Sequence, residues 1–443
     1  MTSRERIETT LQHQQPDVLP VDFGGGFQTG IHVSMVYKLR QALGLDAPGT
    51  PVRVVEIYQM LGEIAPDLKE AIGIDTACLS GTGTMFGFSA KTFKEWALHD
   101  GTPVLVPTAF NTEPEPNGDL LQYPGGDRSV PASGRMPAGG HFFDATDRAK
   151  PVDDDYLDTA DNGEEFTAIE DDELAHYAEK ARQLATSTDK ALFCTFGGLT
   201  FGDVALVPAT FLKDPKGIRD VEEWYISTMT RPDYIKAVFE RQAEIAVQNL
   251  ARLYEVVGDR ITVIQTNGTD FGTQNGPFCS PNMYRELYLP YQQKVNGWIH
   301  DHTPWKTFIH SCGGIDPLLP LIIEAGFDIL NPVQTSCKGL DDTAALKAQW
   351  GDRLAFHGAM DVQQMMPNAT RDELRWEIAH RMTDLGHDGG YIIAPCHNIG
   401  HDIPVETTLA FFEMVRELGR YPLDHADILA TNKSYFARVG ATK

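Results

Sequence analysis

The feature of this sequence that most constrains its fold is the alternation of short apolar strands with longer helical segments in the second half of the chain. Strand-like runs occur at 191–196, 261–266, 305–310, 327–333, 353–357 and 391–394. This alternation is typical of a parallel sheet, because a helical crossover must return the chain to the same end of the sheet. Two earlier runs, at 18–23 and 74–79, bring the expected strands to eight. Eight such strands favour an α/β fold closed as a (β/α)8 TIM barrel.

The segment from about residue 81 to 184 departs from this alternation. Glycine, proline, aspartate and asparagine become frequent there, and Pro116-Asn117-Gly118-Asp119 is typical of a hairpin turn. Because insertions enter barrels between strands and helices, we predict a β-rich insertion after the second strand. Residues 144–173 carry thirteen acidic and two basic side chains, which we interpret as a solvated face. One barrel domain over residues 1–443, with this insertion, accounts for the length of the chain.

The composition excludes several classes of partner. A formal net charge of -25 disfavours nucleic acid and anionic membrane surfaces. The six cysteines have no short regular spacing, and the first residues lack the apolar core of a signal peptide. No apolar run approaches the length of a membrane span. We therefore expect a cytoplasmic protein with free thiols and no disulfide framework.

A histidine and a cysteine lie at the end of the strand expected at 305–310. Side chains alternate along a strand, so His310 and Cys312 leave it on the same face. Cys396 follows the last expected strand, at 391–394. Two thiolates and one imidazole are the ligand set of a zinc site whose fourth position stays open for chemistry. The alternative is a buried histidine with two inert core cysteines, but the shared position of these residues past apolar strands favours the metal.

Asp270 and His397 are the candidate catalytic residues. His397 follows Cys396 directly and can act as a proton donor, a substrate contact or a ligand in place of Cys396. Asp270 lies in Gly268-Thr269-Asp270-Phe271-Gly272, where it can accept a proton or hold an ammonium or hydroxyl group. The alternative for Asp270 is a turn aspartate that bonds its own backbone.

Further polar side chains follow the expected strands, where barrel enzymes place their chemistry. Gln334 ends Asn331-Pro332-Val333-Gln334, which contains no carboxylate. Either Gln334 orients the substrate or water fills the remaining metal position. The candidate substrate-binding residues are Asp22, Phe23, Asn267, Gln334, His357 and Asp361.

Four motifs resemble the uroporphyrinogen decarboxylase superfamily. They are His310-Ser311-Cys312-Gly313-Gly314, Glu324-Ala325-Gly326-Phe327-Asp328, Phe356-His357-Gly358-Ala359-Met360-Asp361 and Gly389-Gly390-Tyr391-Ile392-Ile393-Ala394-Pro395. Within that superfamily, the His-x-Cys and the distant Cys resemble the zinc-dependent, corrinoid-linked methyltransferases. The resemblance implies a (β/α)8 barrel and methyl transfer between a corrinoid and a thiol or other acceptor. The arginine-rich motif with which the decarboxylases grip propionate groups is missing near residues 18–26, which disfavours porphyrinogen decarboxylation.

The expected function is zinc-dependent transfer of a methyl group between a corrinoid such as methylcobalamin and a small-molecule substrate or a thiol or folate acceptor. The chain has no Asp-x-His-x-x-Gly corrinoid signature, so we expect the corrinoid on a partner protein. The ligands alone also fit a zinc-bound water and hydrolysis, and only the resemblance favours the thiol. Two alternatives are a metal-independent, decarboxylase-like lyase acting on a small carboxylic acid and a non-catalytic barrel stabilised by its metal. Residues 419–443 are interpreted as a polar tail that packs on the barrel or on a second subunit of a homodimer.

Overall fold

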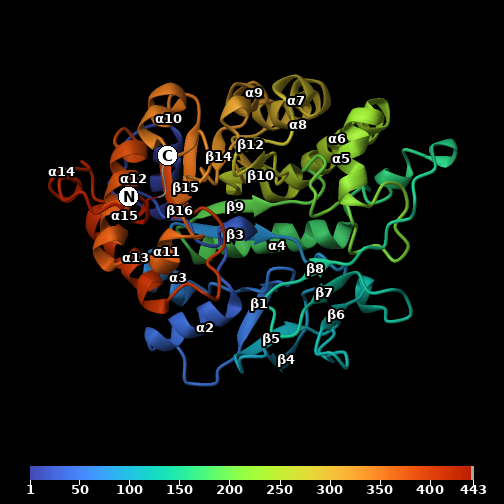
Figure 1. The fold of residues 1–443 in the computed structure, drawn as a ribbon, viewed down its shortest axis with the longest axis horizontal. Coiled ribbons are helices and arrows are strands. Elements are labelled where there is room, and N and C mark those ends of the chain that lie inside the picture. Colours follow the sequence, from blue (N-terminus) through green and yellow to red (C-terminus); the bar gives the residue numbers. More distant parts are fainter. Residues whose placement is uncertain (441–443) are drawn as a thin grey trace.

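A computed structural model describes residues 1–440 and contains a curled parallel sheet of seven strands (Figure 1). In spatial order the strands are β16 (Tyr391–Pro395), β15 (Ala355–Met360), β14 (Ile329–Asn331), β13 (Lys306–His310), β10 (Val263–Asn267), β9 (Ala191–Thr195) and β3 (Thr76–Ser80). All six pairings in this sheet are parallel. The alternation in the sequence therefore predicted an α/β fold correctly, and the curled sheet is consistent with a TIM-like barrel.

The strand expected at 18–23 is reduced to two isolated bridges, of which only the one at Val21 reaches the barrel sheet. Val21 forms an isolated parallel bridge with Ile393 of β16. On the other side, the carbonyl of Val21 accepts a hydrogen bond of 2.9 Å from the backbone N–H of Asp75, next to β3. The preceding Pro20 has no N–H to donate, which limits how far a strand ladder can extend here. A single residue thus spans the gap between the two edge strands of the sheet.

Helix α1 (Ser3–Leu11) closes the bottom of the barrel. Its Ile7 and Leu11 belong to a buried cluster with residues from inside the sheet. The other members of this cluster are Ala191, Phe193, Val263, Phe308, Ile329, Ala355 and Ile392. Several of them are the first residues of their strands, so the amino-terminal end of the barrel is filled with apolar side chains. The carboxyl-terminal end is left for function.

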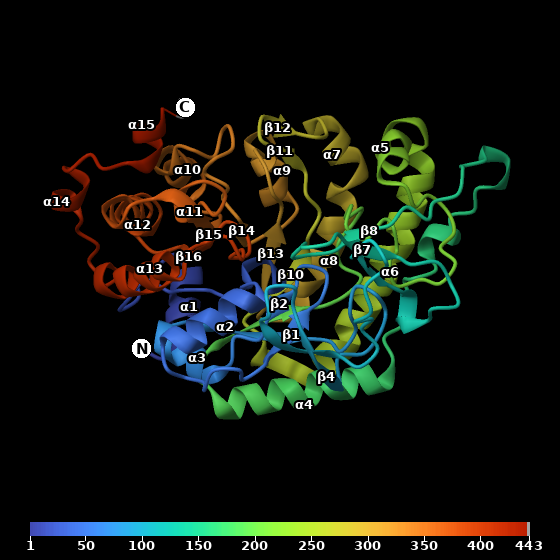
Figure 2. The same ribbon diagram turned by 60° about the horizontal axis from the view of Figure 1, so that its bottom comes forward.

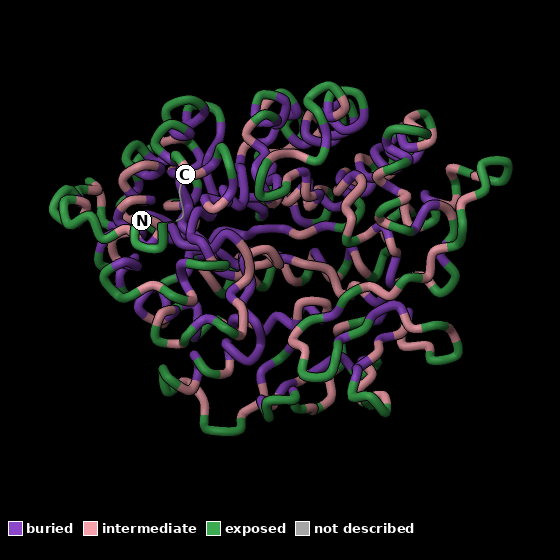
Figure 3. The backbone as a smooth tube through the Cα atoms, in the orientation of Figure 1, coloured by how far each residue is buried: buried purple, intermediate pink, exposed green. Residues whose placement is uncertain are grey.

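Helices connect the strands and surround the sheet (Figures 1 and 2). Those that follow β3 are α4 (Asp171–Ser187), α5 (Val221–Thr230), α6 (Pro232–Val257), α7 (Pro281–Leu287), α8 (Leu289–His302), α9 (Leu319–Glu324), α10 (Thr343–Trp350), α11 (Met365–Asn368), α12 (Arg371–Gly386) and α13 (Val405–Leu418). Helix α6 buries Ile235, Val238 and Phe239 at helical spacing, which is why its apolar face packs inward. Figure 3 shows the buried residues concentrated along the sheet and on the inner faces of the helices. Among the described helices, none is long and apolar enough to cross a membrane.

A second layer of strands lies beside the barrel, in the lower part of Figure 1. One sheet has the order β2 (Leu61–Gly62), β1 (Val52–Glu56), β5 (Pro103–Pro107) and β4 (Phe93–Ala97). A smaller antiparallel sheet contains β6 (Leu120–Gln122), β7 (Gly134–Met136) and β8 (Asp144–Ala145). The expected insertion therefore contains strands, but its sheet also recruits β1 and β2 from the preceding segment, and residues 171–187 form helix α4.

The sequence pattern also predicts helices at 32–42, 57–72 and 281–302, and the last two differ from the structure. The helix expected at 57–72 is helical only over α3 (Pro66–Ile72), because the preceding residues pair within the second sheet. The helix expected at 281–302 is divided into α7 and α8 at Tyr288. Helix α2 (Val33–Ala42) agrees with the sequence pattern. The tail contains α14 (Ala426–Leu429) and α15 (Tyr435–Val439), both of which contact α12. The last residues of the expected tail, 441–443, lie outside the described part of the chain.

Candidate metal centre and active site

The ends of strands β13 and β16 bring the candidate ligands together. His310 is the last residue of β13 and Cys312 lies two positions further on. The Sγ of Cys312 lies 3.4 Å from the Nε2 of His310. Two zinc ligands bound at about 2.0 and 2.3 Å in a tetrahedral arrangement lie roughly 3.6 Å apart. The spacing of these two atoms therefore fits a shared metal ion.

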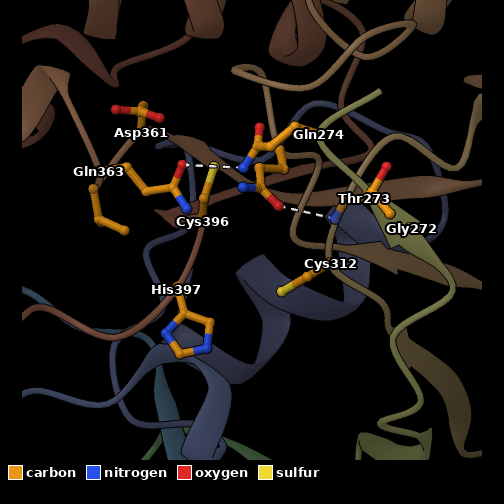
Figure 4. A pocket seen from close by; sticks show the side chains of 11 residues that line it. Gly272, Thr273, Gln274, Cys312, Asp361, Gln363, Cys396 and His397 are labelled. Carbon is orange, nitrogen blue, oxygen red and sulfur yellow. Dashed lines mark hydrogen bonds between the residues drawn. The ribbon is translucent and has the colours of Figure 1, made fainter. Parts of the chain in front are cut away.

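His397 completes a group of three ligating side chains. The ligating atoms of His310, Cys312 and His397 all lie within 4.8 Å of one another. Figure 4 shows the Cys312 sulfur pointing toward the imidazole ring of His397. Burial and the charge of His310 lower the pKa of His397 to about 4. The imidazole is neutral at pH 7 and can offer a lone pair to a metal.

Cys396, the third ligand expected from the sequence, is not part of this group of three. Its side chain is buried, and its Sγ lies 3.5 Å from the backbone carbonyl oxygen of Val333. It still lines the same cavity as Cys312 and His397. Burial raises the pKa of the Cys396 thiol well above its ordinary value, so the thiol stays protonated without a metal.

Two side chains fix the backbone of the Cys312 loop. A carboxylate oxygen of Asp270 accepts a hydrogen bond of 2.7 Å from the backbone N–H of Cys312. The side-chain oxygen of Gln334 accepts one of 2.9 Å from the backbone N–H of Gly313. Asp270 Oδ1 also lies 3.7 Å from His310 Nε2, which makes it the carboxylate beside the candidate metal position.

Gly313 allows this loop to pass very close to another one. Its φ is +91°, a region that L-residues with a side chain rarely adopt. A Cβ atom on Gly313 would lie 2.2 Å from the carbonyl carbon of Gly272, just after Asp270. Gly272 begins the short hairpin of β11 (Gly272–Thr273) and β12 (Gly276–Pro277). The glycines thus hold the two loops that carry Asp270 and Cys312 in direct backbone contact.

A cavity of about 300 Å³ opens beside the candidate ligands (Figure 4). It is lined by Gly272, Thr273, Gln274, Cys312, Gly313, Gln334, Asp361, Val362, Gln363, Cys396 and His397. Gln274 and Gln363 face each other across it, with 3.5 Å between Nε2 and Oε1. None of the described residues that line the cavity is a lysine or an arginine. The cavity therefore suits a neutral or thiol-bearing molecule better than one with several carboxylates.

Only some of the expected substrate-binding residues line the cavity, and the others lie beneath it or in the buried core. Gln334 and Asp361 line the cavity, although Asp361 also accepts backbone hydrogen bonds from Gln364 and Met365 at the start of α11. Asn267 lies beneath the site and donates a hydrogen bond of 3.0 Å to the carbonyl of His310. Phe23 is fully buried and packs against Phe411 and Phe412. Asp22 and His357 are also buried.

Two residues near the site were not among the sequence candidates. Asn331, at the end of β14, accepts a hydrogen bond of 2.6 Å from Nδ1 of His310. Partial burial and the nearby charge of Asp270 raise the pKa of Asp203 to about 7. Neither residue belongs to a spacing pattern. The position of Asn331 at a strand end was the one available signal.

The fold and the site together define a parallel α/β barrel with a His-Cys-His group at its carboxyl-terminal mouth that could hold a metal ion. The family model for uroporphyrinogen decarboxylase (URO-D) matches residues 140–418, and the chain belongs to this family. Members of this family are enzymes. The resemblance found in the sequence motifs is thereby confirmed at the level of the family.

Individual relatives are more distant. Uroporphyrinogen decarboxylase from Psychromonas ingrahamii is 31% identical over 150 residues, which cover 32% of this chain and 39% of that protein. The enzyme from Mannheimia succiniciproducens is 28% identical over 144 residues, covering 31% of this chain and 37% of that protein. The matched stretch thus spans less than two fifths of each of these two relatives. A solved methyltransferase from Methanosarcina mazei has a TM-score of 0.54 at 15% identity, covering 94% of this chain and 99% of that one, and shows a shared fold.

Proposed function

We propose that this protein is a zinc-dependent methyltransferase that passes a methyl group between a corrinoid and a small thiol or related acceptor. The observation that supports this function is the convergence of His310, Cys312 and His397 beside a cavity without a basic side chain among its described lining residues. Thiolate and imidazole ligands suit zinc better than magnesium, calcium or manganese, which prefer oxygen ligands. The fold shared with a methyltransferase adds a structural precedent.

His310, Cys312 and His397 would hold the zinc ion, with Cys396 as the alternative to His397. The donor set fits the ion, because two neutral imidazoles and one thiolate leave a fourth position on the cavity side. Zinc, when bound, supplies a Lewis acid that keeps a thiol in the open position deprotonated near neutral pH. Burial and the charge of Asp270 raise the pKa of the Cys312 thiol. Cys312 therefore becomes a thiolate only with a metal beside it.

The remaining residues would position the acceptor and manage its proton. Asp270 is placed to take the proton that an acceptor thiol releases, since it lies 3.7 Å from His310 Nε2. Gln274, Gln334 and Gln363 offer neutral amides around the cavity, which can orient polar groups without demanding a charge. The corrinoid would arrive on a partner protein, because the sequence has no corrinoid signature of its own.

Decarboxylation of a small carboxylic acid is the second candidate. The names of the curated relatives favour it. The absence of a cation among the described residues that line the cavity weighs against it, because a buried carboxylate without a positive partner is costly. A small acid with a single carboxylate could still accept a hydrogen bond from the neutral His397 ring.

Metal analysis of purified variants tests the ligand set. We expect about one zinc per chain in the wild type. Cys312→Ser and His397→Gln should lose it, and Cys396→Ser should retain it. Cys337→Ser is the matched control, because Cys337 is a buried thiol hydrogen-bonded to Gln274 and lies outside the group of three. Loss of zinc from Cys396→Ser together with retention in His397→Gln would assign the third position to Cys396 instead.

An activity assay then tests the reaction. Zinc-loaded protein is incubated with methylcobalamin and a panel of thiols and folates, and demethylation is followed in the cobalamin spectrum. We expect turnover with at least one thiol, and none with Cys312→Ser. Release of carbon dioxide from a panel of small carboxylic acids by zinc-free protein, with no demethylation, would establish the second candidate.

A further inference from the structure

We propose that Asp22 and His357, acting through Asn331, fix which nitrogen of His310 carries its proton and thereby keep Nε2 free for the metal. The four side chains Asp22, His357, Asn331 and His310 are called the tautomer relay below. This inference rests on the proposed metal site. It assigns positioning roles to Asp22 and His357, which do not line the cavity that contains Cys312.

The relay is a continuous chain of hydrogen bonds across the barrel interior. His357 Nε2 lies 3.0 Å from Asp22 Oδ2. His357 Nδ1 lies 2.8 Å from Asn331 Nδ2. Asn331 Oδ1 lies 2.6 Å from His310 Nδ1. Asp22, His357 and Asn331 are at most 1% exposed and His310 is 6% exposed, so bulk water does not compete for these groups.

The direction of the relay is set at Asp22, which is held as a carboxylate. Its oxygens accept hydrogen bonds from the hydroxyl of Thr76, the backbone N–H of Gly25 at 2.8 Å and the hydroxyl of Thr29 at 2.7 Å. Three donors directed at the oxygens of Asp22 stabilise its charged form. A carboxylate can only accept, so the fourth bond must be donated by His357 Nε2–H.

Each later bond follows from this first one. The NH2 group of Asn331 can only donate, so the Nδ1 of His357 that it faces accepts, and the ring carries its proton on Nε2. The same NH2 group also faces the backbone carbonyl of His357 at 3.5 Å, which supports its orientation. Asn331 therefore turns its oxygen toward His310 and accepts a proton from Nδ1–H. His310 is left with an unprotonated Nε2, the atom that lies 3.4 Å from Cys312 Sγ.

The consequence is a metal ligand whose lone pair is prepared before the metal arrives. Histidine ligands commonly donate their second ring N–H to a protein acceptor, and mutation of that partner typically weakens metal binding about 10- to 100-fold. Here a second histidine and a buried carboxylate stand behind the first acceptor, Asn331. Asp22 thus determines that Nε2 of His310 carries the free lone pair at the mouth of the barrel. Asp22 lies next to Val21, whose bridge joins the two edge strands of the sheet.

Asp22→Asn tests the direction of the relay. The side-chain oxygen of the introduced asparagine must still face the backbone N–H of Gly25, so its NH2 group will face His357 Nε2. The proton of His357 then moves to Nδ1, the amide of Asn331 turns over, and His310 becomes protonated on Nε2. We expect zinc affinity to fall about 10- to 100-fold, measured by competition with a chelating dye. Unchanged affinity would overturn the proposal.

Asn331→Asp provides a rescue that a merely structural role would not produce. A carboxylate at position 331 accepts from His310 Nδ1–H whichever way His357 is protonated. Asn331→Asp alone should therefore bind zinc within a few-fold of wild type, and the double variant Asp22→Asn/Asn331→Asp should regain most of the lost affinity. A double variant as weak as Asp22→Asn would show that the relay does not act through Asn331.

A measurement on the wild type needs no variant. In zinc-free protein labelled with 15N-histidine, two-bond 1H–15N correlations report the protonated nitrogen of each ring. We expect Nδ1–H for His310 and Nε2–H for His357, and the opposite pair of tautomers would overturn the proposal. This measurement separates the two proposals. A wild type that binds no zinc would refute the proposed metal site, whereas the observed tautomers test the tautomer relay whether or not zinc binds.

Discussion

The imidazole rings of His141 and His401 are stacked, with 3.3 Å between ring centroids and 13° between ring planes. His32 and His99 also lie against His141, with ring centroids 5.4 and 4.6 Å away. His141 comes from the segment after β7 and His401 from the loop after β16. The four rings therefore join the second layer of strands to the mouth of the barrel, and protonation would place like charges in contact.

Acid should weaken this contact. Burial and the charge of His141 lower the pKa of His32 to about 4 from 6.5. Between those two pH values the unfolded chain binds a proton that the folded chain does not, so stability falls as pH falls through this window. This pKa shift corresponds to a contribution of roughly 3 kcal/mol to the free energy of unfolding when it is lost completely. Urea unfolding at pH 7 and pH 4.5 should show a decline that is smaller in His32→Asn, which keeps an N-cap for α2.

Metal removal should leave the fold intact. The barrel buries its apolar clusters without any contribution from His310 or Cys312. After treatment with a strong chelator, far-ultraviolet circular dichroism should remain unchanged, and thermal unfolding should shift by only a few degrees. Collapse of the helical signal on chelation would instead support a non-catalytic barrel that depends on its metal.

Gly313→Ala should disrupt the metal site while leaving most of the barrel folded. The added Cβ would lie 2.2 Å from the carbonyl carbon of Gly272, and the φ of +91° is unfavourable for alanine. We expect the Cys312 loop to move and zinc affinity to fall by about tenfold or more. Gly297→Ala is the matched control, because no atom lies within 4 Å of its added Cβ and alanine favours helix α8.

Phe23→Ala should lower stability without changing the metal site. Phe23 is fully buried, with ring centroids 4.7 Å from Phe412 and 5.5 Å from Phe411. Truncating a buried phenylalanine costs about 3–5 kcal/mol. The denaturation midpoint should fall accordingly, while zinc bound per folded chain stays the same. An unchanged denaturation midpoint combined with a changed KM would instead support Phe23 as a substrate-binding residue, as the sequence predicts.

The order of the barrel strands could be predicted because each strand is a short apolar run followed by a helix. The helix expected at 57–72 was partly wrong for the opposite reason. Leu61 and Gly62, inside the expected helix, pair with β1 instead, and β1 itself pairs with β5 through Val52 and Val104, about fifty positions apart in the chain. Pairing over such a distance leaves no local signal in the sequence.

The sequence could predict those residues of the candidate site whose orientation follows from the alternation of side chains along a strand. His310 and Cys312 point to the same place, as strand alternation predicts, although Cys312 lies two residues beyond the end of β13. Strand β16 ends at Pro395, so alternation no longer determines whether Cys396 or His397 faces the site. Asn331 could not be recognised from sequence, because its partners His310 and His357 are 21 and 26 residues away.

The single bridge at Val21 has a consequence for how the molecule opens. A joint of one residue should separate at a lower free energy than the ladders elsewhere in the sheet, so amide hydrogens near it should exchange with solvent early. Asp22 follows this joint directly. Any ligand that needs Asp22 in place therefore also favours the closed ring. Ligand binding at the mouth of the barrel should therefore also slow the opening of the Val21 bridge, because both depend on the same closed state.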